Sequence, residues 1–259
     1  MRKPNLRENS LRAPSFLVQL VDLALIELTN WRWAWRPMVI TGVIAPAFAI
    51  VGLGIFARDS GADALAYVLT GNVVLSLLFE NQDKVAGHFA FMRLNGILNY
   101  FSTLPVRRHA LILAVVLSFL LMSLPSLVIT VLLGSALLGV PVQLHPIILL
   151  VVPVCAISMS GVGSLIGVSV RMPQDVGSVS LLLTFLMLGL GPVMVPPDRL
   201  PGVAVFLGRF SPATYAASAM RQALLGPVTG QIAVDLAALL GFTLVTLWLV
   251  GRKMDWRQK

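Results

Sequence analysis

Charged residues are scarce in this chain. Of its 259 residues, 19 are Lys or Arg and 11 are Asp or Glu, so that only 12% are charged. A soluble domain carries about 25% charged residues. At the same time, 57% of the residues are hydrophobic, and a water-soluble fold of this size cannot bury so much apolar surface under so few charges. The composition excludes an ordinary soluble enzyme, a disordered chain and a nucleic-acid-binding domain, and it predicts a membrane protein.

The motifs that bind nucleotides and metals are also missing. No Gly-x-x-x-x-Gly-Lys-Ser/Thr loop occurs, so that the chain cannot hold the phosphates of a nucleotide by itself. The three histidines (His88, His109 and His145) are spread over separate regions and offer no convergent set of metal ligands. The single cysteine, Cys155, cannot form an intrachain disulfide, and it lies in an apolar stretch that favours a buried side chain. We therefore expect no catalytic residue, no metal and no cofactor in this chain.

Long apolar windows dominate the sequence instead. About 20 helical apolar residues cross the roughly 30 Å of hydrocarbon in a bilayer. The stretch between Arg108 and Arg171 has no charged residue and is long enough for two crossings, with a turn at Gly139-Val140-Pro141 and His145-Pro146. The sequence predicts an all-α polytopic membrane protein with a single transmembrane domain over residues 1–259. Its six predicted spans are residues 37–57, 64–84, 110–136, 147–169, 176–196 and 232–251.

Lys and Arg residues are distributed unevenly over this topology. If the N-terminus lies inside, all but four of them fall in inside segments, the exceptions being Arg58, Arg199, Arg209 and Arg221. An excess of positive charge marks the cytoplasmic side of a membrane protein. We therefore expect both termini to be cytoplasmic and the protein to lie in the cell membrane. The net charge of +8 then reflects topology rather than a nucleic-acid partner.

Residues 15–35 form the first of three segments that are not predicted to span. On a helical wheel its polar residues fall on one arc, and its leucines lie opposite, which is the pattern of an amphipathic helix. Trp31, Trp33 and Trp35 alternate with arginines at its end and suit the headgroup layer. We predict an interfacial helix, with a soluble packing helix as the alternative. The polar residues of the arc are Gln19, Asp22, Glu27, Thr29 and Asn30.

The other two segments lie between predicted spans. In residues 91–105, the apolar residues Leu94, Ile97, Leu98 and Phe101 follow helical spacing, and Pro105 ends the run. Spacing alone fits equally a platform for another protein and a helix that merely covers the bundle. Residues 197–229 are too broken by Pro and Gly for a span and too apolar for a free loop. There we predict a re-entrant or surface-bound pair of helices.

Few ionisable residues are expected at depth in the bilayer. Glu80 and Lys84 are spaced i, i+4 near the inner end of the second predicted span, where they are expected to pair. A proton-driven carrier usually needs a buried carboxylate, so that this pattern weakens the carrier interpretation. In the fourth predicted span, the spacing Gly163-x-x-x-Gly167 indicates a face for close helix packing.

Two segments carry a resemblance to a known family. The first runs from Arg93-Leu94-Asn95-Gly96-Ile97-Leu98 through Ser102-Thr103-Leu104-Pro105-Val106-Arg107. The second runs from Ser211-Pro212-Ala213-Thr214-Tyr215 through Met220-Arg221-Gln222-Ala223-Leu224-Leu225-Gly226. In their order and predicted positions, they resemble the membrane subunit of ABC-2 type exporters, such as the daunorubicin-exporter and nodulation-exporter permeases. The resemblance covers nearly the whole chain.

This resemblance implies a transmembrane permease, in a homodimer or heterodimer of such subunits. Each would dock on a separate nucleotide-binding ATPase, which would bind ATP and Mg²⁺. Residues 91–105 would be the coupling helix and residues 15–35 a connecting helix. The coupling residues would be Arg93, Leu94, Gly96, Ile97, Leu98, Phe101 and Pro105.

The second and fifth predicted spans indicate the substrate class. They offer an apolar path with few polar groups, for which the candidate residues are Asn72, Ser76, Phe185 and Met187. We therefore expect export of an amphipathic or hydrophobic substrate, such as a drug, lipid or glycolipid. Two other classes of function stay open: a secondary, ion-coupled carrier, and a membrane assembly protein that transports nothing.

Overall fold

The computed structural model describes residues 15–57, 61–104 and 106–253, and their side chains except those of residues 30–41 and 56–57. Throughout these residues, every regular element is a helix. The elements are α1 (Phe16–Ala57), α2 (Ala62–Leu77), η2 (Leu78–Asp83), α3 (Lys84–Leu94), α4 (Ile97–Thr103), α5 (Arg108–Leu138), α6 (Ile148–Ser169), η3 (Pro173–Asp175), α7 (Val176–Gly189), η4 (Pro197–Arg199), α8 (Gly202–Gly208), α9 (Pro212–Leu225) and α10 (Gln231–Lys253).

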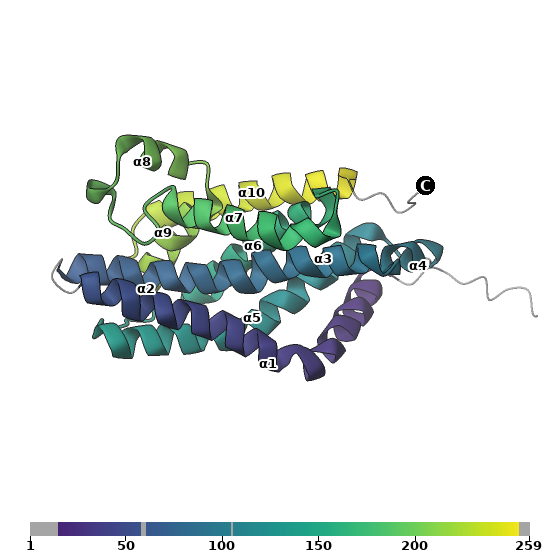
Figure 1. The fold of residues 1–259 in the computed structure, drawn as a ribbon, viewed down its shortest axis with the longest axis horizontal. Helices are drawn as coiled ribbons and strands as arrows, with labels where there is room; N and C mark the ends of the chain where they lie inside the picture. The colour runs from purple at the N-terminus through teal and green to yellow at the C-terminus, as the bar shows by residue number, and fades with distance from the viewer. Residues whose placement is uncertain (1–14, 58–60, 105, 254–259) are drawn as a thin grey trace, which may run out of the picture.

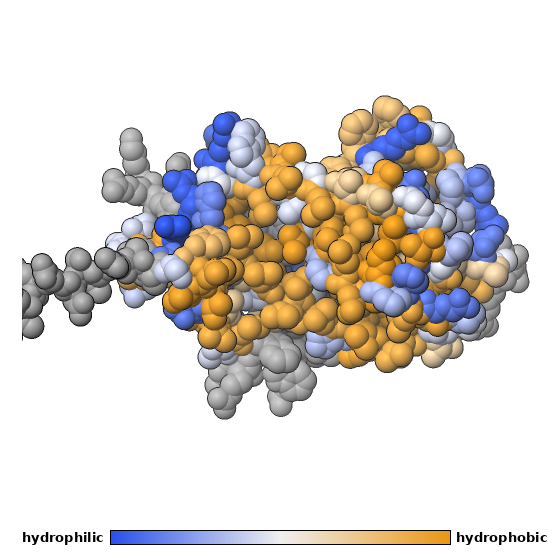
Figure 2. Space-filling view, turned by 180° about the vertical axis from the view of Figure 1, so that it is seen from behind, coloured by the Kyte–Doolittle hydropathy of each residue, from blue (hydrophilic) through white to orange (hydrophobic). Residues whose placement is uncertain are grey.

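The long helices lie side by side along the long axis of the molecule (Figure 1). The start of α1, the short helix α4 and the last turn of α10 share one end, which we call the inner end. The pair α8 and α9 lies at the opposite, outer end. Figure 2 shows a broad hydrophobic surface with hydrophilic residues gathered toward the two ends, as expected for a protein that crosses a bilayer.

In the part of the chain that the structure describes, four helices are long and apolar enough to cross a membrane: Ala62–Leu94, Arg108–Leu138, Ile148–Ser169 and Gln231–Lys253. Two shorter apolar helical segments occupy the places of the first and fifth predicted spans. They are Gly42–Ile55, which is part of α1, and Pro173–Gly189, which comprises η3 and α7. The predicted fold class, an all-α polytopic membrane protein, is therefore confirmed. Hydropathy alone identifies these helices because each must satisfy its backbone internally in lipid.

The helix that contains the second predicted span is longer than that span. Instead of ending at residue 84, the helix continues through η2 and α3 to Leu94, a rod of 33 residues. At 1.5 Å per residue the rod is about 50 Å long, which exceeds the hydrocarbon thickness of roughly 30 Å. The prediction placed the end at the run of polar residues that begins at Glu80. That run lies within the continuous helix. Where along this helix the membrane span ends stays a prediction.

Helix α1 joins two segments that were predicted separately, residues 15–35 and 37–57. It is one continuous helix of 42 residues, and it bends so that its first part crosses the inner end of the bundle (Figure 1). Pro37 is the first residue of the second predicted segment, and a proline within a helix removes one backbone hydrogen bond and favours a bend. The side chains of Trp31, Trp33 and Trp35 lie outside the described residues.

The first part of α1 turns part of its polar arc toward the bundle. Gln19 and Glu27 are buried, whereas Leu17, Val21 and Leu25 are exposed. The Gln19 side chain accepts a hydrogen bond from the backbone N–H of Arg107, and Glu27 contacts His88 at 3.2 Å. The face of this helix that points away from the bundle is therefore mostly apolar, with Asp22 and Thr29 also exposed. Such a face suits contact with lipid, and its position at the membrane surface stays a prediction.

The predicted outer segment, residues 197–229, forms the helical pair α8 and α9. The residues of α9 that face the bundle are fully buried, and most are alanines: Ala213, Ala216, Ala217, Ala219, Met220, Ala223 and Leu224. Small side chains let α9 pack closely on α2, α6 and α10 in the larger hydrophobic core. Helix α8 instead exposes Val203 and Phe206, and Phe210 just after it is also exposed.

Candidate functional site

Five consecutive polar residues, Glu80-Asn81-Gln82-Asp83-Lys84, interrupt the second span. They occupy the π-helix η2 and the first residue of α3, and the side chains of Glu80, Asn81 and Gln82 are buried. π-helical turns are rare and often lie at functional sites. Polar residues inside a membrane-spanning bundle are expensive and are functional candidates by default. We refer to these five residues as the polar cluster.

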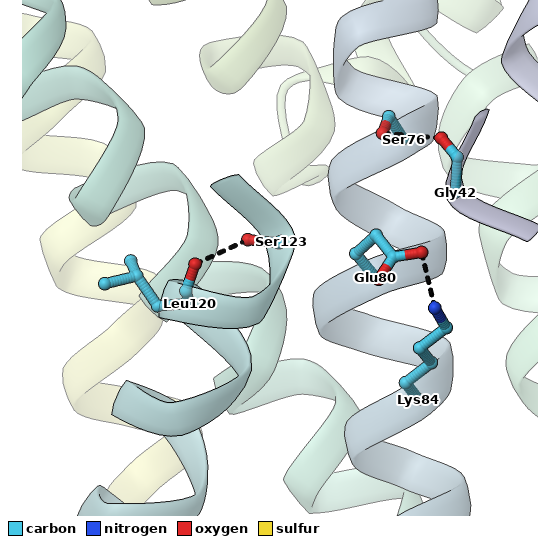
Figure 3. Close-up of polar contacts among 6 residues, drawn as sticks. All are labelled: Gly42, Ser76, Glu80, Lys84, Leu120 and Ser123. Carbon is cyan, nitrogen blue, oxygen red and sulfur yellow. Dashed lines mark hydrogen bonds and ion pairs between the residues drawn. The ribbon is translucent and has the colours of Figure 1, made fainter. Parts of the chain in front are cut away.

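Glu80 and Lys84 form the pair that their i, i+4 spacing predicts. The Lys84 ammonium lies 2.5 Å from Glu80 Oε1, as Figure 3 shows. One turn away, Ser76 donates a hydrogen bond to the carbonyl oxygen of Gly42 on α1. A methyl group added at Gly42 would overlap the Glu80 carboxylate and would lie 2.8 Å from Ser126 Oγ. Close packing of α1 and α5 therefore encloses Glu80.

Helix α7 is attached to the polar cluster by hydrogen bonds. Its buried residues are Val176, Ser180 and Thr184, four apart on one face. Asp83 Oδ1 accepts hydrogen bonds from Ser180 Oγ at 2.5 Å and from Thr184 Oγ1 at 3.0 Å. Gln82 Nε2 also donates to Thr184 Oγ1, at 2.8 Å. The interface between α7 and the second span thus combines these polar contacts with apolar packing of Val176 in one cluster with Ala86 and Ala90.

The backbone of helix α6 packs closely against the backbone of the second span, on the other side of the polar cluster. A methyl group at Gly163 would overlap the carbonyl oxygen of Gln82, and one at Gly167 would lie 2.7 Å from the carbonyl oxygen of Ala86. The predicted Gly163-x-x-x-Gly167 packing face is therefore confirmed. Among the described residues, Asn81 Nδ2 and Gln82 Oε1 have no hydrogen-bond partner. Such unsatisfied atoms are rare in buried positions and mark this region as a candidate site.

The predicted coupling helix, residues 91–105, is not one helix. α3 ends at Leu94, and α4 begins only at Ile97. Between them Gly96 has φ +67°, in the left-handed region that glycine adopts without strain. The prediction of a continuous helix failed because apolar spacing does not reveal such a break. Pro105 lies outside the described residues.

The apolar face of α4 covers the protein's own bundle. Leu98 is only 7% exposed, and the partly buried Ile97 and Phe101 lie in the same hydrophobic cluster. This cluster also contains Leu23 of α1 and Leu111 of α5. Four other apolar side chains near α4 are exposed at the inner end, and we call them the apolar tip: Phe91, Leu94, Tyr100 and Leu104.

A second polar group lies near the outer end. The guanidinium of Arg221 on α9 lies 3.5 Å from the ring centroid of Tyr67. Burial lowers the pKa of Arg221, and the nearby Tyr67 and Asp235 oppose this shift. Gln222 Nε2 lies 3.2 Å from Asp235 Oδ2 and links α9 to α10. Within the part of the chain described, Arg221 Nε and Nη2 have no hydrogen-bond partner.

The chain thus forms a long bundle with a bent first helix, a turn between α3 and α4 at the inner end, and an outer helical pair of which α9 is buried. The family model of the ABC-2 type transporter matches residues 29–225. The chain belongs to the ABC-2 type transporter family. It is therefore a permease subunit of an ABC transporter, the non-catalytic membrane component. A comparison with curated proteins found no match.

The predicted substrate residues of this permease do not share one surface. Asn72 is buried and donates to the carbonyl oxygen of Val68, and Ser76 is buried against α1. Phe185 is exposed on the face of α7 that points away from the bundle, whereas Met187 is partly buried in the core. Their role in transport stays a prediction.

Sequence reasoning missed Asp83, Ser180 and Thr184 of the permease. A run of five polar residues beside an apolar window was the available signal, but it was interpreted as the end of the span. The hydroxyls of Ser180 and Thr184 carry no signal of their own, because serine and threonine are common in transmembrane helices that pack closely.

Proposed function

We propose that this permease works with a separate ATPase subunit, which binds ATP and Mg²⁺, and exports an amphipathic or hydrophobic substrate. The apolar tip is the single observation that carries the ATPase partnership. Phe91, Leu94, Tyr100 and Leu104 are exposed at the inner end. Exposed apolar side chains gathered at one place are typical of a protein interaction site. Membership of an ABC transporter family favours ATP-driven transport over the two alternatives, an ion-coupled carrier and an assembly protein.

The two faces of α4 suggest how a movement of the ATPase during ATP hydrolysis would be transmitted to the bundle. Tyr100 and Leu104 face outward, where an ATPase would contact them, and Leu98 packs inward on α1 and α5. Because packed side chains transmit displacement rather than absorb it, a movement of α4 would be passed to both helices. The coupling role thus moves from the predicted residues Leu98 and Phe101 to their exposed neighbours.

We further propose that two permeases assemble, as a homodimer or a heterodimer, in the cell membrane with their termini in the cytoplasm. Helices α1 and α7 each expose a row of large apolar residues. Lipid covers such surfaces, and a second permease would cover part of them. The residues are Ile44, Phe48, Val51 and Ile55 on α1, and Leu181, Leu182, Phe185 and Leu186 on α7.

The substrate class follows from the surface that the bundle offers to lipid. The exposed face of α7 is apolar, and a polar line of Asp83, Ser180 and Thr184 lies behind it. A substrate with an apolar body and a small polar group would find both kinds of contact there. This arrangement supports an amphipathic substrate better than a purely hydrophobic one.

Reconstitution tests the proposal. The permease would be co-purified with an ATPase encoded beside it and placed in proteoliposomes, with amphipathic dyes, lipids and small charged metabolites as test substrates. We expect ATP-dependent movement of an amphipathic compound, and no ATP hydrolysis by the permease alone. Transport that persists without the ATPase would contradict the partnership. Saturable export of a small, highly charged metabolite would contradict the substrate class.

A further inference from the structure

An open pocket of about 600 Å³ lies at the inner end of the permease. The start of α1, the end of α4 and the start of α5 surround it. Its lining residues are Phe16, Ser102, Val106, Arg107, Arg108 and His109. We propose that this pocket binds the phosphate of an anionic phospholipid headgroup. This site is distinct from the polar cluster and from the apolar tip.

The pocket carries positive charge that no carboxylate of the described residues neutralises. Arg107 and Arg108 are both exposed, and arginine keeps its charge throughout the physiological pH range. The ion pairs found among the described residues are Lys84–Glu80 and His88–Glu27, so that neither arginine has a carboxylate partner there. Arg108 Nη1 donates to the carbonyl oxygen of Gly251, which fixes the guanidinium at the pocket wall and leaves its other N–H groups for a ligand.

The backbone adds to this charge. Helix α5 begins at Arg108, and no side chain caps its first turn. The N–H of Arg107 is bonded to Gln19, and those of Ala110 and Leu111 are bonded to the carbonyl oxygen of Arg107. The described residues offer no acceptor to the N–H groups of Arg108 and His109. A helix of 31 residues directs the positive end of its dipole to this place, which favours an anion.

The hydroxyl of Ser102 contributes less to anion binding than the arginines and the backbone. Ser102 Oγ already donates its proton to the carbonyl oxygen of Asn99, at 2.6 Å. A bound phosphate would therefore receive its hydrogen bonds from the arginines and the α5 backbone. Phe16 and Val106 line the pocket with apolar surface, which suits the glycerol and first methylenes of a lipid better than a free ion.

The pocket lies where lipid headgroups are expected. Two candidate spans end beside it: α5 begins at Arg108 and α10 ends at Lys253, and the hydrogen bond from Arg108 to Gly251 holds these ends together. The first part of α1 exposes Leu17, Val21 and Leu25 at the same end. On the predicted orientation this is the cytoplasmic leaflet, whose anionic lipids attract basic groups near the surface. A pocket at that level would lie beside the phosphates of these lipids.

Native mass spectrometry tests the assignment. Delipidated full-length permease in detergent would be mixed with dioleoyl-phosphatidylglycerol or dioleoyl-phosphatidylcholine, and the bound lipid counted. We expect preferential retention of phosphatidylglycerol and about fivefold weaker retention in Arg107→Gln, as removal of one surface arginine implies. Arg107→Lys, which restores the charge, is expected to recover most of the retention.

A matched control lies at the same end. Arg252→Gln removes the same charge, but the Arg252 guanidinium stacks on Trp248 at 3.8 Å rather than lining the pocket. This variant is expected to retain the lipid. Equal losses in both variants would reduce the effect to general surface charge and overturn the proposal.

Two further outcomes would overturn the proposal by showing that something other than a lipid occupies the pocket. If inorganic phosphate displaced the lipid at equal concentration, the pocket would be a site for the free anion. If Arg107→Gln kept the lipid but no longer co-purified with the ATPase, an acidic side chain of that partner would be the occupant. Retention of the ATPase together with loss of the lipid supports the proposal, and it separates this result from any failure of the proposed ATPase partnership.

Discussion

Arg93 Nη1 donates a hydrogen bond of 2.6 Å to the carbonyl oxygen of Val170. The same nitrogen donates to the carbonyl oxygen of Gly167 at 3.0 Å. The last carbonyls of a helix lack partners within it, and a cation stabilises the negative end of the helix dipole. The side chain that the family resemblance assigns to ATPase coupling therefore also fastens the end of α3 to the end of α6.

Replacing Arg93 by Ala is expected to destabilise the permease itself. Two charge-assisted hydrogen bonds would be lost, and the free energy of unfolding should fall by about 1–3 kcal/mol. Thermal unfolding of the purified protein in detergent measures this, with Arg252→Ala as a control at the same end. Unchanged stability combined with loss of the ATPase would show that Arg93 acts only in coupling.

The apolar tip and the buried face of α4 should respond differently to a charge. Leu98→Asp places a carboxylate in the core, where burial of an unpaired charge costs several kcal/mol, about 3 or more; less folded permease should be recovered. Leu94→Asp is expected to leave folding intact and to reduce co-purification with the ATPase, because Leu94 is 55% exposed.

Leu144→Asp is the control for this pair. Leu144 is 66% exposed, and it lies in the connection between α5 and α6, away from the inner end. Permease recovery and bound ATPase would be quantified together. If Leu98→Asp folded normally and Leu94→Asp kept its ATPase, the assignment of the two faces would be wrong.

Gly163→Ala should disturb the packing of α6 on the second span. The added methyl group would overlap the carbonyl oxygen of Gln82, and backbone atoms cannot move aside without separating the helices. We expect a loss of about 1–3 kcal/mol in stability. Gly177→Ala, at a glycine with open space around it, should be neutral or stabilising, by up to about 1 kcal/mol. A stability change of the same sign in both variants would contradict the packing argument.

Loss of the hydroxyls on α7 should loosen this helix from the bundle. Ser180→Ala and Thr184→Val each remove a hydrogen bond to Asp83, at about 1 kcal/mol per bond. Hydrogen exchange along α7 should rise relative to α6. Ser178→Ala is the control because Ser178 lies on the exposed side of the same helix. Exchange that rises equally in the control would show that the polar contacts do not hold α7.

Properties that depend on near neighbours in the chain could be predicted from the sequence. The apolar helices, the i, i+4 pair of Glu80 and Lys84, and the Gly163-x-x-x-Gly167 face follow from composition and from the period of a single helix. These features hold whatever the helix packs against. The family resemblance likewise rested on short motifs, and the family model confirms it over residues 29–225.

Only the tertiary structure decided which faces are covered. The spacing of Leu98 and Phe101 fits a docking helix and a covering helix equally, and only the contacts with α1 and α5 show that Leu98 is buried in the protein's own bundle. The helix that carries Glu80 continues to Leu94 rather than ending at residue 84, so that Glu80 lies within it. Ser180 and Thr184 gain a partner in Asp83 because α7 packs on η2, almost a hundred residues earlier in the chain. Burial and hydrogen bonding of a side chain depend on such distant contacts, which no local pattern contains.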